Sequence, residues 1–266
     1  MGDAAHWVNI IILGIVEGVT EFLPVSSTGH LIITAHWLGE NSAGGKLFEV
    51  VIQLGAIVAV CYEFRARLLQ MARDWRGEAT RRMAVNLTLA FLPAAILGLL
   101  LYDTIKLYLF SPVTVALALI VGGVVIIWAE RRPRASRIMQ MEELRPRDAL
   151  VVGLCQTLSL FPGVSRAGAT IIGAMLWGVE RRTATEFSFF LALPVMFAAS
   201  GYDLWKSRDL LNWQLAGDIA LGFVVSFVSA LLVIRVLLRY VSRHNFTPFG
   251  WYRIIFGLLV LAVFAS

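Results

Sequence analysis

Long apolar runs, separated by short polar segments rich in arginine, make up most of the chain. Six of these runs are close to the roughly 17–25 residues that an α-helix needs to cross about 30 Å of hydrocarbon. The pattern therefore predicts six transmembrane helices, at Leu47–Phe64, Ala84–Leu101, Pro112–Ala129, Thr183–Leu204, Ala216–Leu238 and Phe249–Phe264.

Two further apolar stretches, Trp7–Leu38 and Ala149–Gly178, are interrupted by a proline followed by small and polar residues. The interruptions lie at Pro24–Gly29 and Pro162–Ser165. Because proline ends a helix, each stretch becomes two half-helices of roughly 12–16 residues, which are too short to cross the bilayer alone. We expect two re-entrant helical hairpins, which are tolerated at membrane depth where protein buries them or where they line a cavity.

The composition supports this interpretation. The chain has 266 residues, of which 58% are apolar and 15% charged, and its mean hydropathy is +0.75. An ordinary soluble domain has about 45–50% apolar and about 25% charged residues. The sequence therefore predicts a single all-α integral membrane domain over residues 1–266, surrounded by membrane lipids and with no nucleic-acid partner. Cys61 and Cys155 lie in apolar runs and are expected to be small core residues.

The arginines predict how the chain is oriented. Seventeen bases lie in four clusters that the spans place on one side, and four lie on the other side. The clusters are Arg65, Arg67, Arg73, Arg76, Arg81 and Arg82; Arg131, Arg132, Arg134, Arg137, Arg145 and Arg147; Arg181 and Arg182; and Arg235, Arg239 and Arg243. The opposite set is Lys46, Lys106, Lys206 and Arg208. Because cytoplasmic loops carry the excess of arginine and lysine, we expect the clusters to be cytoplasmic and both termini to lie outside. The two hairpins then enter from opposite faces. Arg253, inside the last span, is expected to snorkel or to pair.

The two hairpins also share residues at an offset of 139 positions. The matches are Gly14 with Gly153, Val25 with Val164, Ser26 with Ser165, Gly29 with Gly168, Ile32 with Ile171, Phe48 with Phe187 and Leu54 with Leu193. Together with the opposed orientations, they predict an inverted-topology repeat. Its copies cover about residues 7–64 and 149–204, with a site near the midplane where the broken helices meet.

Two acids precede the first break. Glu17 and Glu21 stand four residues apart and therefore share one face of a half-helix. A carboxylate at membrane depth is retained where it is paired, metal-bound or facing water. A hard divalent cation such as Mg²⁺ or Ca²⁺ suits oxygen ligands of this kind. We expect Glu17 and Glu21 to bind such a cation and to act in catalysis; the alternative is that they pair with arginines.

Hydroxyl groups and a histidine follow the same break. A helix that begins at Ser26 or Ser27 presents free N–H groups and the positive end of its dipole, which is an anion site. Helix capping is the alternative role for either serine. His30 lies within a turn of both serines and can act as base, acid or phosphate donor. We expect Ser26 and Thr28 to bind substrate, and Ser27 and His30 to be catalytic.

The second break repeats the design with different chemistry. Ser165, Arg166 and Thr170 follow its proline and are expected to bind substrate. A guanidinium at membrane depth is suited to forked recognition of phosphate oxygens, so Arg166 is also expected to act in catalysis. Pairing of Arg166 with Glu17 or Glu21 is the alternative, and both roles are compatible. Because the acids and the histidine occur in the first copy alone, an enzyme is favoured over a pure transporter.

At these residues the sequence resembles the bacterial undecaprenyl-diphosphate phosphatases of the bacitracin-resistance type. The first motif of that family is matched by Glu17, Glu21, Pro24, Ser26, Ser27 and His30, and the second by the segment from Pro162 to Thr170. The likeness extends to Phe48–Gly55 and Glu186–Phe189 and covers nearly the whole chain. One departure is Ala167, where the family usually has serine.

The resemblance implies hydrolysis of the terminal phosphate of a C55 polyprenyl diphosphate, which yields the monophosphate carrier lipid and inorganic phosphate. It also implies a divalent-cation requirement, a bacterial inner-membrane location, a site open to the periplasm, and a role in peptidoglycan synthesis, cell shape and bacitracin resistance.

Two alternatives stay open at this point. Either Ser27 attacks the phosphate with His30 as base, or His30 activates water directly. The rival function is a lipid-phosphate flippase that uses the same anion site. The sequence does not fix the oligomeric state, and a homodimer is one alternative.

Overall fold

The computed structural model describes residues 2–39, 43–109, 111–132, 135–206 and 216–264. Arg134 and Arg208, two of the orienting bases, lie outside the described residues. Within those ranges the chain is helical with no β-strand, which confirms the all-α prediction. The helices are α1 (Gly2–Thr20), α2 (Ser27–Leu38), α3 (Ala43–Glu63), α4 (Arg65–Arg73), α5 (Glu78–Tyr108), α6 (Pro112–Arg131), η1 (Met141–Glu143), α7 (Pro146–Gln156), η2 (Thr157–Leu160), α8 (Arg166–Trp177), α9 (Arg181–Lys206), α10 (Ala216–Val241) and α11 (Thr247–Phe264).

Five of these helices are long and apolar enough to cross a membrane, so the chain is a multi-pass membrane protein. They are α5, α6, α9, α10 and α11, and each contains one of the predicted spans. The remaining predicted span, Leu47–Phe64, forms most of α3. Helices α5, α6, α10 and α11 carry exposed aliphatic side chains, such as Leu100 at 73% and Val236 at 64% exposure, as expected of surfaces that face lipid.

The two interrupted stretches fold as broken helices with the same backbone. Shifted by 139 residues, the limits of α2 coincide with those of α8. The residue before each helix, Ser26 or Ser165, has φ = 73°, and the glycine after each, Gly39 or Gly178, is left-handed at φ = 69° or 101°. Glycine adopts that conformation without penalty, but a serine at positive φ is strained. The two copies of the repeat therefore share a strained backbone conformation at corresponding serines.

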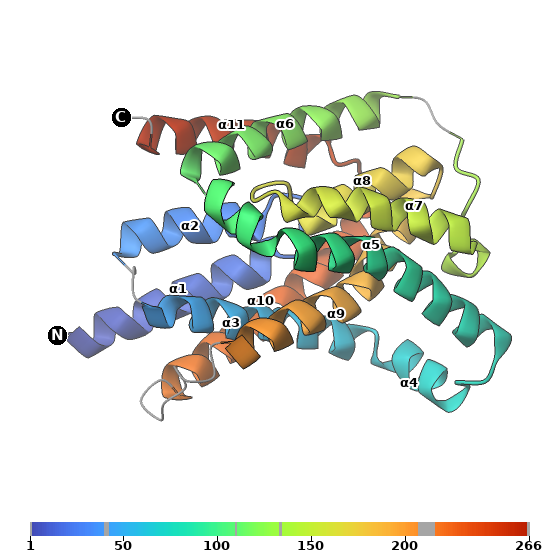
Figure 1. Ribbon diagram of the computed structural model, residues 1–266, viewed down its shortest axis with the longest axis horizontal. Helices are drawn as coiled ribbons and strands as arrows, with labels where there is room; N and C mark the ends of the chain where they lie inside the picture. The colour runs from blue at the N-terminus through green and yellow to red at the C-terminus, as the bar shows by residue number, and fades with distance from the viewer. Residues whose placement is uncertain (1, 40–42, 110, 133–134, 207–215, 265–266) are drawn as a thin grey trace.

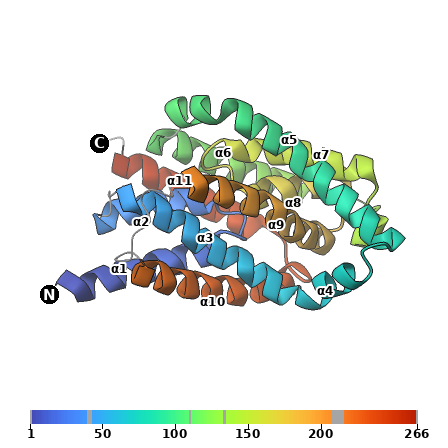
Figure 2. The same cartoon turned by 60° about the horizontal axis from the view of Figure 1, so that its bottom comes forward.

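Figures 1 and 2 show how the broken helices are arranged. The pair α1 and α2 opens toward the end of the molecule where α11 finishes, and the pair α7 and α8 opens toward the opposite end, near α4. The breaks of the two pairs meet in the middle. The arginine-rich α4 lies at the second end, where its Arg67 forms an ion pair with Glu142 of η1, just before α7 (Figure 1).

Close helix pairs enclose these breaks. The helix α11 packs along α6, where a methyl group on Gly123 would overlap the Gly250 carbonyl and one on Gly257 would overlap that of Ala116. The helix α10 packs in the same way along α1 and α3. An aromatic core includes Phe22 at the first break and Phe189 of α9. Their rings meet edge to face with 5.3 Å between centroids.

Candidate active site

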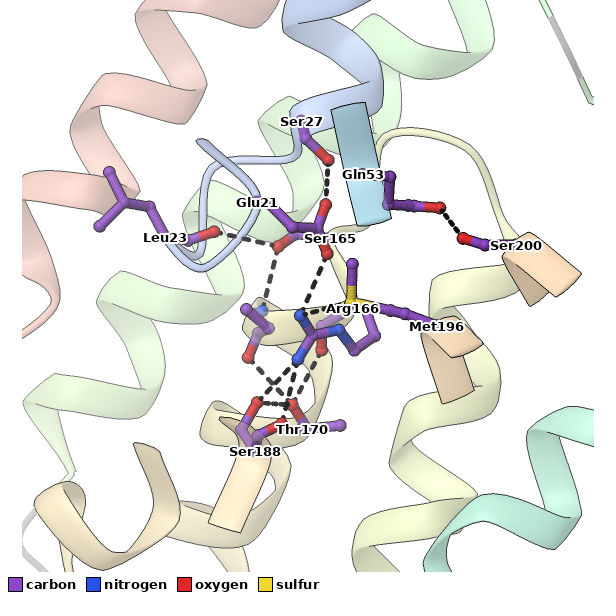
Figure 3. Close-up of polar contacts among 12 residues, drawn as sticks. Glu21, Leu23, Ser27, Gln53, Ser165, Arg166, Thr170, Ser188, Met196 and Ser200 are labelled. Carbon is purple, nitrogen blue, oxygen red and sulfur yellow. Dashed lines mark hydrogen bonds and ion pairs between the residues drawn. The ribbon is translucent and has the colours of Figure 1, made fainter. Parts of the chain in front are cut away.

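The two helix breaks lie against each other and bring residues far apart in the sequence into one cluster (Figure 3). Ser165 Oγ, at the second break, lies 3.5 Å from the carbonyl oxygen of Leu23 at the first. The same hydroxyl accepts the Gly168 N–H at 3.1 Å and so caps α8. The buried Ser26, by contrast, makes no capping bond with its side chain. The side chain of Ser165 therefore caps its helix, whereas that of Ser26 does not.

Glu21 links the predicted nucleophile to the predicted anion-binding arginine (Figure 3). Ser27 donates its hydroxyl hydrogen to Glu21 Oε2 at 2.6 Å. Arg166 Nη2 donates to the other oxygen, Oε1, at 3.1 Å. Both charged side chains are largely buried, at 6% exposure for Glu21 and 10% for Arg166. A charge pair this sheltered is strongly coupled, because little water screens it.

The rest of the Arg166 guanidinium is held by α9. Nη1 donates to the carbonyl oxygen of Ser188 at 3.1 Å, and Nη2 lies 3.6 Å from the sulfur of Met196. Thr170 Oγ1 donates to the Arg166 carbonyl at 2.9 Å and lies 2.6 Å from Ser188 Oγ. The Thr170 hydroxyl is thus fully buried among protein groups and supports Arg166. The Nε–H of Arg166 is buried without a partner, so it is available to an anion. Thr28, in the first turn of α2, is half-buried.

Glu17 lies one helical turn before Glu21, whose N–H donates to the Glu17 carbonyl at 2.9 Å. Its side chain is 1% exposed, and its Oε2 atom has no hydrogen-bond partner. An unpartnered carboxylate oxygen in such a position is a ready ligand for a cation. In the part of the chain that the structure describes, no three Asp, Glu, His or Cys side chains come together as a metal site. Among those residues, the acids of the first break form a pair, Glu17 and Glu21.

The ring nitrogens of His30 contact groups other than Ser27. Its Nδ1 lies 2.7 Å from the carbonyl oxygen of Ser26, and its Nε2 lies 2.6 Å from the hydroxyl of Tyr252 on α11. Phe256, one turn further, stacks on the imidazole with 4.1 Å between ring centroids. Among the described residues no hydrogen bond joins His30 to Ser27. Tyr252 and Phe256 stand four residues apart and therefore share one face of α11. This spacing was the sequence signal for an aromatic contact with His30, and it was not recognised from the motifs.

Arg253 differs from its sequence interpretation. Its side chain is 0% exposed, so it does not snorkel to an interface, and within the described part of the chain its acceptors are backbone carbonyl oxygens and no acid. Three of these carbonyls belong to the helix breaks: Pro24 at the first, and Gly163 and Val164 at the second.

An apolar cavity of about 800 Å³ lies between α5, η2 and α9. Its lining begins beside the second break at Leu160 and Val195 and continues to Tyr202 and Asp203 near the end of α9. Val195 directly precedes Met196, whose sulfur contacts Arg166. The cavity and the polar cluster therefore lie on two faces of the same helix.

Comparison with known proteins was made by family and by individual sequence. The chain matches the family model described as "Bacitracin resistance protein BacA" over residues 10–259. It is 58% identical to the undecaprenyl-diphosphatase of Nitrosospira multiformis over 252 residues, which cover 94% of this chain and 92% of the relative. It is 55% identical to the undecaprenyl-diphosphatase of Dechloromonas aromatica, with 98% of this chain and 95% of the relative covered.

Proposed function

The chain belongs to the family of bacitracin resistance protein BacA, and on that premise we propose that it is an integral membrane undecaprenyl-diphosphatase. Such an enzyme removes the terminal phosphate of undecaprenyl diphosphate and releases undecaprenyl phosphate and inorganic phosphate. In a bacterial cell this regenerates the lipid carrier for peptidoglycan synthesis, and bacitracin resistance is the trait for which the family is named. The observation that carries the proposal is the hydrogen-bonded chain of Ser27, Glu21 and Arg166, which is largely sheltered at the junction of two helix breaks.

We place the protein in the bacterial inner membrane with six crossing helices, α3, α5, α6, α9, α10 and α11. The pairs α1–α2 and α7–α8 are the re-entrant hairpins of an inverted repeat. Three observations support this arrangement: the equal limits of α2 and α8 under the 139-residue shift, the opposite directions in which the pairs open, and the arginine-rich segments at one end (Figure 1). Both termini are then outside, and the site is reached from the periplasm.

The diphosphate is held where the N-terminus of α8 meets the first break. Helix N-termini present unpaired N–H groups and a positive dipole to anions. Arg166 adds a fixed charge. Glu21 and Ser188 hold its guanidinium in place, and its Nε–H has no partner and can donate to the diphosphate. In phosphoryl transfer most of the catalytic effect comes from positioning and from stabilising charge on the phosphate oxygens.

The contacts favour Ser27 as nucleophile and Glu21 as the group that takes its proton. The Ser27 oxygen attacks the terminal phosphorus, the hydroxyl proton passes to Glu21, and the bond from that phosphorus to the bridging oxygen breaks. Undecaprenyl phosphate leaves, and water then hydrolyses the phosphoserine to give inorganic phosphate. This route uses a hydrogen bond that already exists at 2.6 Å. His30 has both ring nitrogens engaged elsewhere, so it acts more simply as a fixed neighbour of the first break.

A divalent cation, Mg²⁺ or Ca²⁺, fits the acids of the first break. Glu17 offers an oxygen without a partner, and Glu21 lies one turn away. Mg²⁺ is commonly held by one or two carboxylates together with substrate phosphates, which suits a site with this pair of acids. When bound, the cation neutralises charge on the phosphate oxygens.

The apolar cavity between α5 and α9 is the proposed place for the part of the isoprenoid chain next to the diphosphate. It begins at the depth of the second break, and its lining is almost entirely apolar. Burial of each methylene group there stabilises the bound lipid by about 0.8 kcal/mol.

Phosphate release by purified protein in detergent tests the proposed function. Detergent micelles have no second compartment, so a flippase would show no turnover, whereas a phosphatase releases phosphate from undecaprenyl diphosphate. Arg166→Ala should lower the rate by several orders of magnitude, because it removes the fixed charge and leaves Glu21 unpaired. Arg182→Ala, at an exposed ion pair with Glu186, is the matched control. Absence of release from the wild-type protein, or a normal rate in Arg166→Ala, would contradict the proposal.

A further inference from the structure

Arg253 of α11 is the largest fully buried side chain among the described residues. A guanidinium has five N–H groups, and all five are used. Nε donates to the Leu119 carbonyl at 3.3 Å and Nη2 to that of Ala118 at 3.0 Å. The other three bonds go to Pro24, Gly163 and Val164, at 3.1, 2.9 and 2.9 Å.

No carboxylate in the described part of the chain forms an ion pair with Arg253. A buried charge is costly unless it is compensated, and five carbonyl dipoles supply the compensation. The benefit is reciprocal, because the carbonyls at a helix break lack the N–H partners that an unbroken helix provides. At membrane depth no water replaces those partners. Arg253 therefore satisfies backbone groups that the two breaks leave open.

The acceptors are related by the internal repeat. Pro24 and Gly163 correspond under the 139-residue shift, and Val164 corresponds to Val25. One residue after Val25 and after Val164 stand the strained serines, Ser26 and Ser165, each with φ = 73°. Arg253 thus holds the segments that lead into α2 and α8 at corresponding points, and it comes from a helix outside both copies.

The packing around the guanidinium is specific. A methyl group on Gly122 of α6 would overlap Arg253 Nη2, and one on Gly168 of α8 would lie 3.4 Å from Nη1. Gly122 therefore leaves the space that the guanidinium fills.

We propose that Arg253 is a positioning residue that fixes the distance between the two breaks, and hence between Ser27 with Glu21 on one side and Arg166 on the other. It does not touch the substrate. This inference rests on the proposed function for its kinetic assay, but it concerns the geometry of the site and applies to any substrate that bridges the breaks.

Arg253→Lys is the first test, because it keeps the charge but concentrates three donors on one atom that cannot reach five carbonyls. We expect kcat of the folded, monodisperse fraction to fall about 10²-fold, since a misplacement of about 1 Å has that effect. KM should change less than about threefold, because α8 and Arg166 remain intact as an anion site. A merely structural role would lower the melting temperature and the yield of folded protein but leave kcat of that fraction unchanged.

Gly122→Ala applies the same test without altering the arginine, because the added methyl group displaces Nη2. It should reproduce the loss of kcat with little change in KM. Arg182→Lys, at an exposed ion pair, is the matched control and should behave as wild type. Wild-type kcat in the folded fraction of either Arg253→Lys or Gly122→Ala would overturn the proposal. If the wild-type protein released no phosphate from undecaprenyl diphosphate, that result would instead refute the proposed function.

Discussion

At the scale of single residues, His30 is held at three points before any substrate binds. Its Nδ1–H donates to the Ser26 carbonyl, because a carbonyl oxygen can only accept. In the neutral ring Nε2 then accepts the hydrogen of the Tyr252 hydroxyl, and Phe256 stacks on the ring face. The Ser26 carbonyl therefore sets the tautomer, and the contacts from α11 fix the direction of the imidazole, which is the usual role of residues that support an active site.

Tyr252→Phe keeps the aromatic ring and removes this hydrogen bond. We expect kcat for phosphate release to fall about tenfold, the effect of losing roughly 1 kcal/mol of orientation. Tyr240→Phe is the control, because its exposed hydroxyl donates to the Asn245 carbonyl in the connection between α10 and α11. A wild-type kcat for Tyr252→Phe would show that His30 needs no fixed partner at Nε2.

Ser27→Ala separates the two chemical routes. If Ser27 is the nucleophile, the variant should lose about 10³-fold or more in kcat, since the first bond cannot form. Acid-quenched wild-type enzyme should carry phosphate on Ser27, detectable by mass spectrometry of the peptide. Ser242→Ala, at a hydroxyl that donates to the Leu238 carbonyl, serves as control. Near-normal turnover of Ser27→Ala would establish direct attack by water.

Two arginines show how far residue roles could be predicted from the sequence. Arg166 follows a proline break within four positions, so local pattern alone placed it at a helix N-terminus. The acceptors of Arg253 at the breaks lie 89, 90 and 229 residues away along the chain. No local pattern encodes such contacts, because they form only when α6, α11 and both breaks have packed together.

At the scale of helices, Asp148 links α7 to α8 at the end of the pair that lies away from the break. This carboxylate accepts the Trp177 indole N–H at 2.8 Å, the Arg145 backbone N–H at 2.9 Å and the Arg137 guanidinium at 3.0 Å. It lies in the first turn of α7, outside the five membrane-length helices. Burial acts to raise the pKa of Asp148, but these hydrogen bonds and the charge of Arg137 outweigh it, so the pKa is lowered from its ordinary value.

Asp148→Asn should therefore lower the melting temperature by about 5 °C near pH 7, because a hydrogen-bonded charge contributes about 2 kcal/mol. A carboxyl whose pKa is lowered by folding stabilises the protein above its unfolded pKa of about 4, and that stabilisation is lost as the pH falls further. The difference between wild type and variant should thus shrink below about pH 4. Thermal unfolding in detergent across that range measures it, and a difference that does not change with pH would contradict the assignment.

At the breaks, the starts of the helices were predicted more closely than their ends, for a local reason. Pro24 and Pro162 marked the breaks, yet α1 ends at Thr20 and α7 at Gln156. The residue before a proline is pushed out of the helical region, and the turns ahead of it tighten, as η2 does at Thr157–Leu160. The following helices begin directly after the two serines, at Ser27 and Arg166, although of these serines Ser165 caps its helix with its side chain and Ser26 does not.

At the scale of the whole molecule, the proposed orientation can be tested with single cysteines in a chain whose Cys61 and Cys155 are replaced by alanine. Ala135→Cys lies between α6 and α7, and Gly217→Cys in the first turn of α10 at the other end. In right-side-out vesicles a membrane-impermeant maleimide should label position 217 at once, and position 135 only after the membrane is opened. The reverse pattern would invert the topology and place the arginine clusters outside.

The cavity between α5 and α9 predicts a dependence on chain length. Ala95→Phe fills part of it and should raise KM for undecaprenyl diphosphate about tenfold, the loss of nearly two buried methylene groups. KM for isopentenyl diphosphate, with five carbons, should stay unchanged because so short a chain does not extend along the cavity. Val121→Phe, on an exposed face of α6, is the control. Equal effects on both substrates would exclude the cavity as the site of the isoprenoid chain.

The contribution of α11 also sets when the molecule can become active during biosynthesis. Every residue of the two sequence motifs precedes α11, but Tyr252 and Arg253 follow α1 to α10 in the order of translation. Until this helix inserts beside α6, the carbonyls at both breaks lack their donor and His30 lacks its neighbour. With Arg253 as the proposed positioning residue, a nascent chain that already contains all the motif residues gains full activity only when α11 has left the ribosome and packed beside α6.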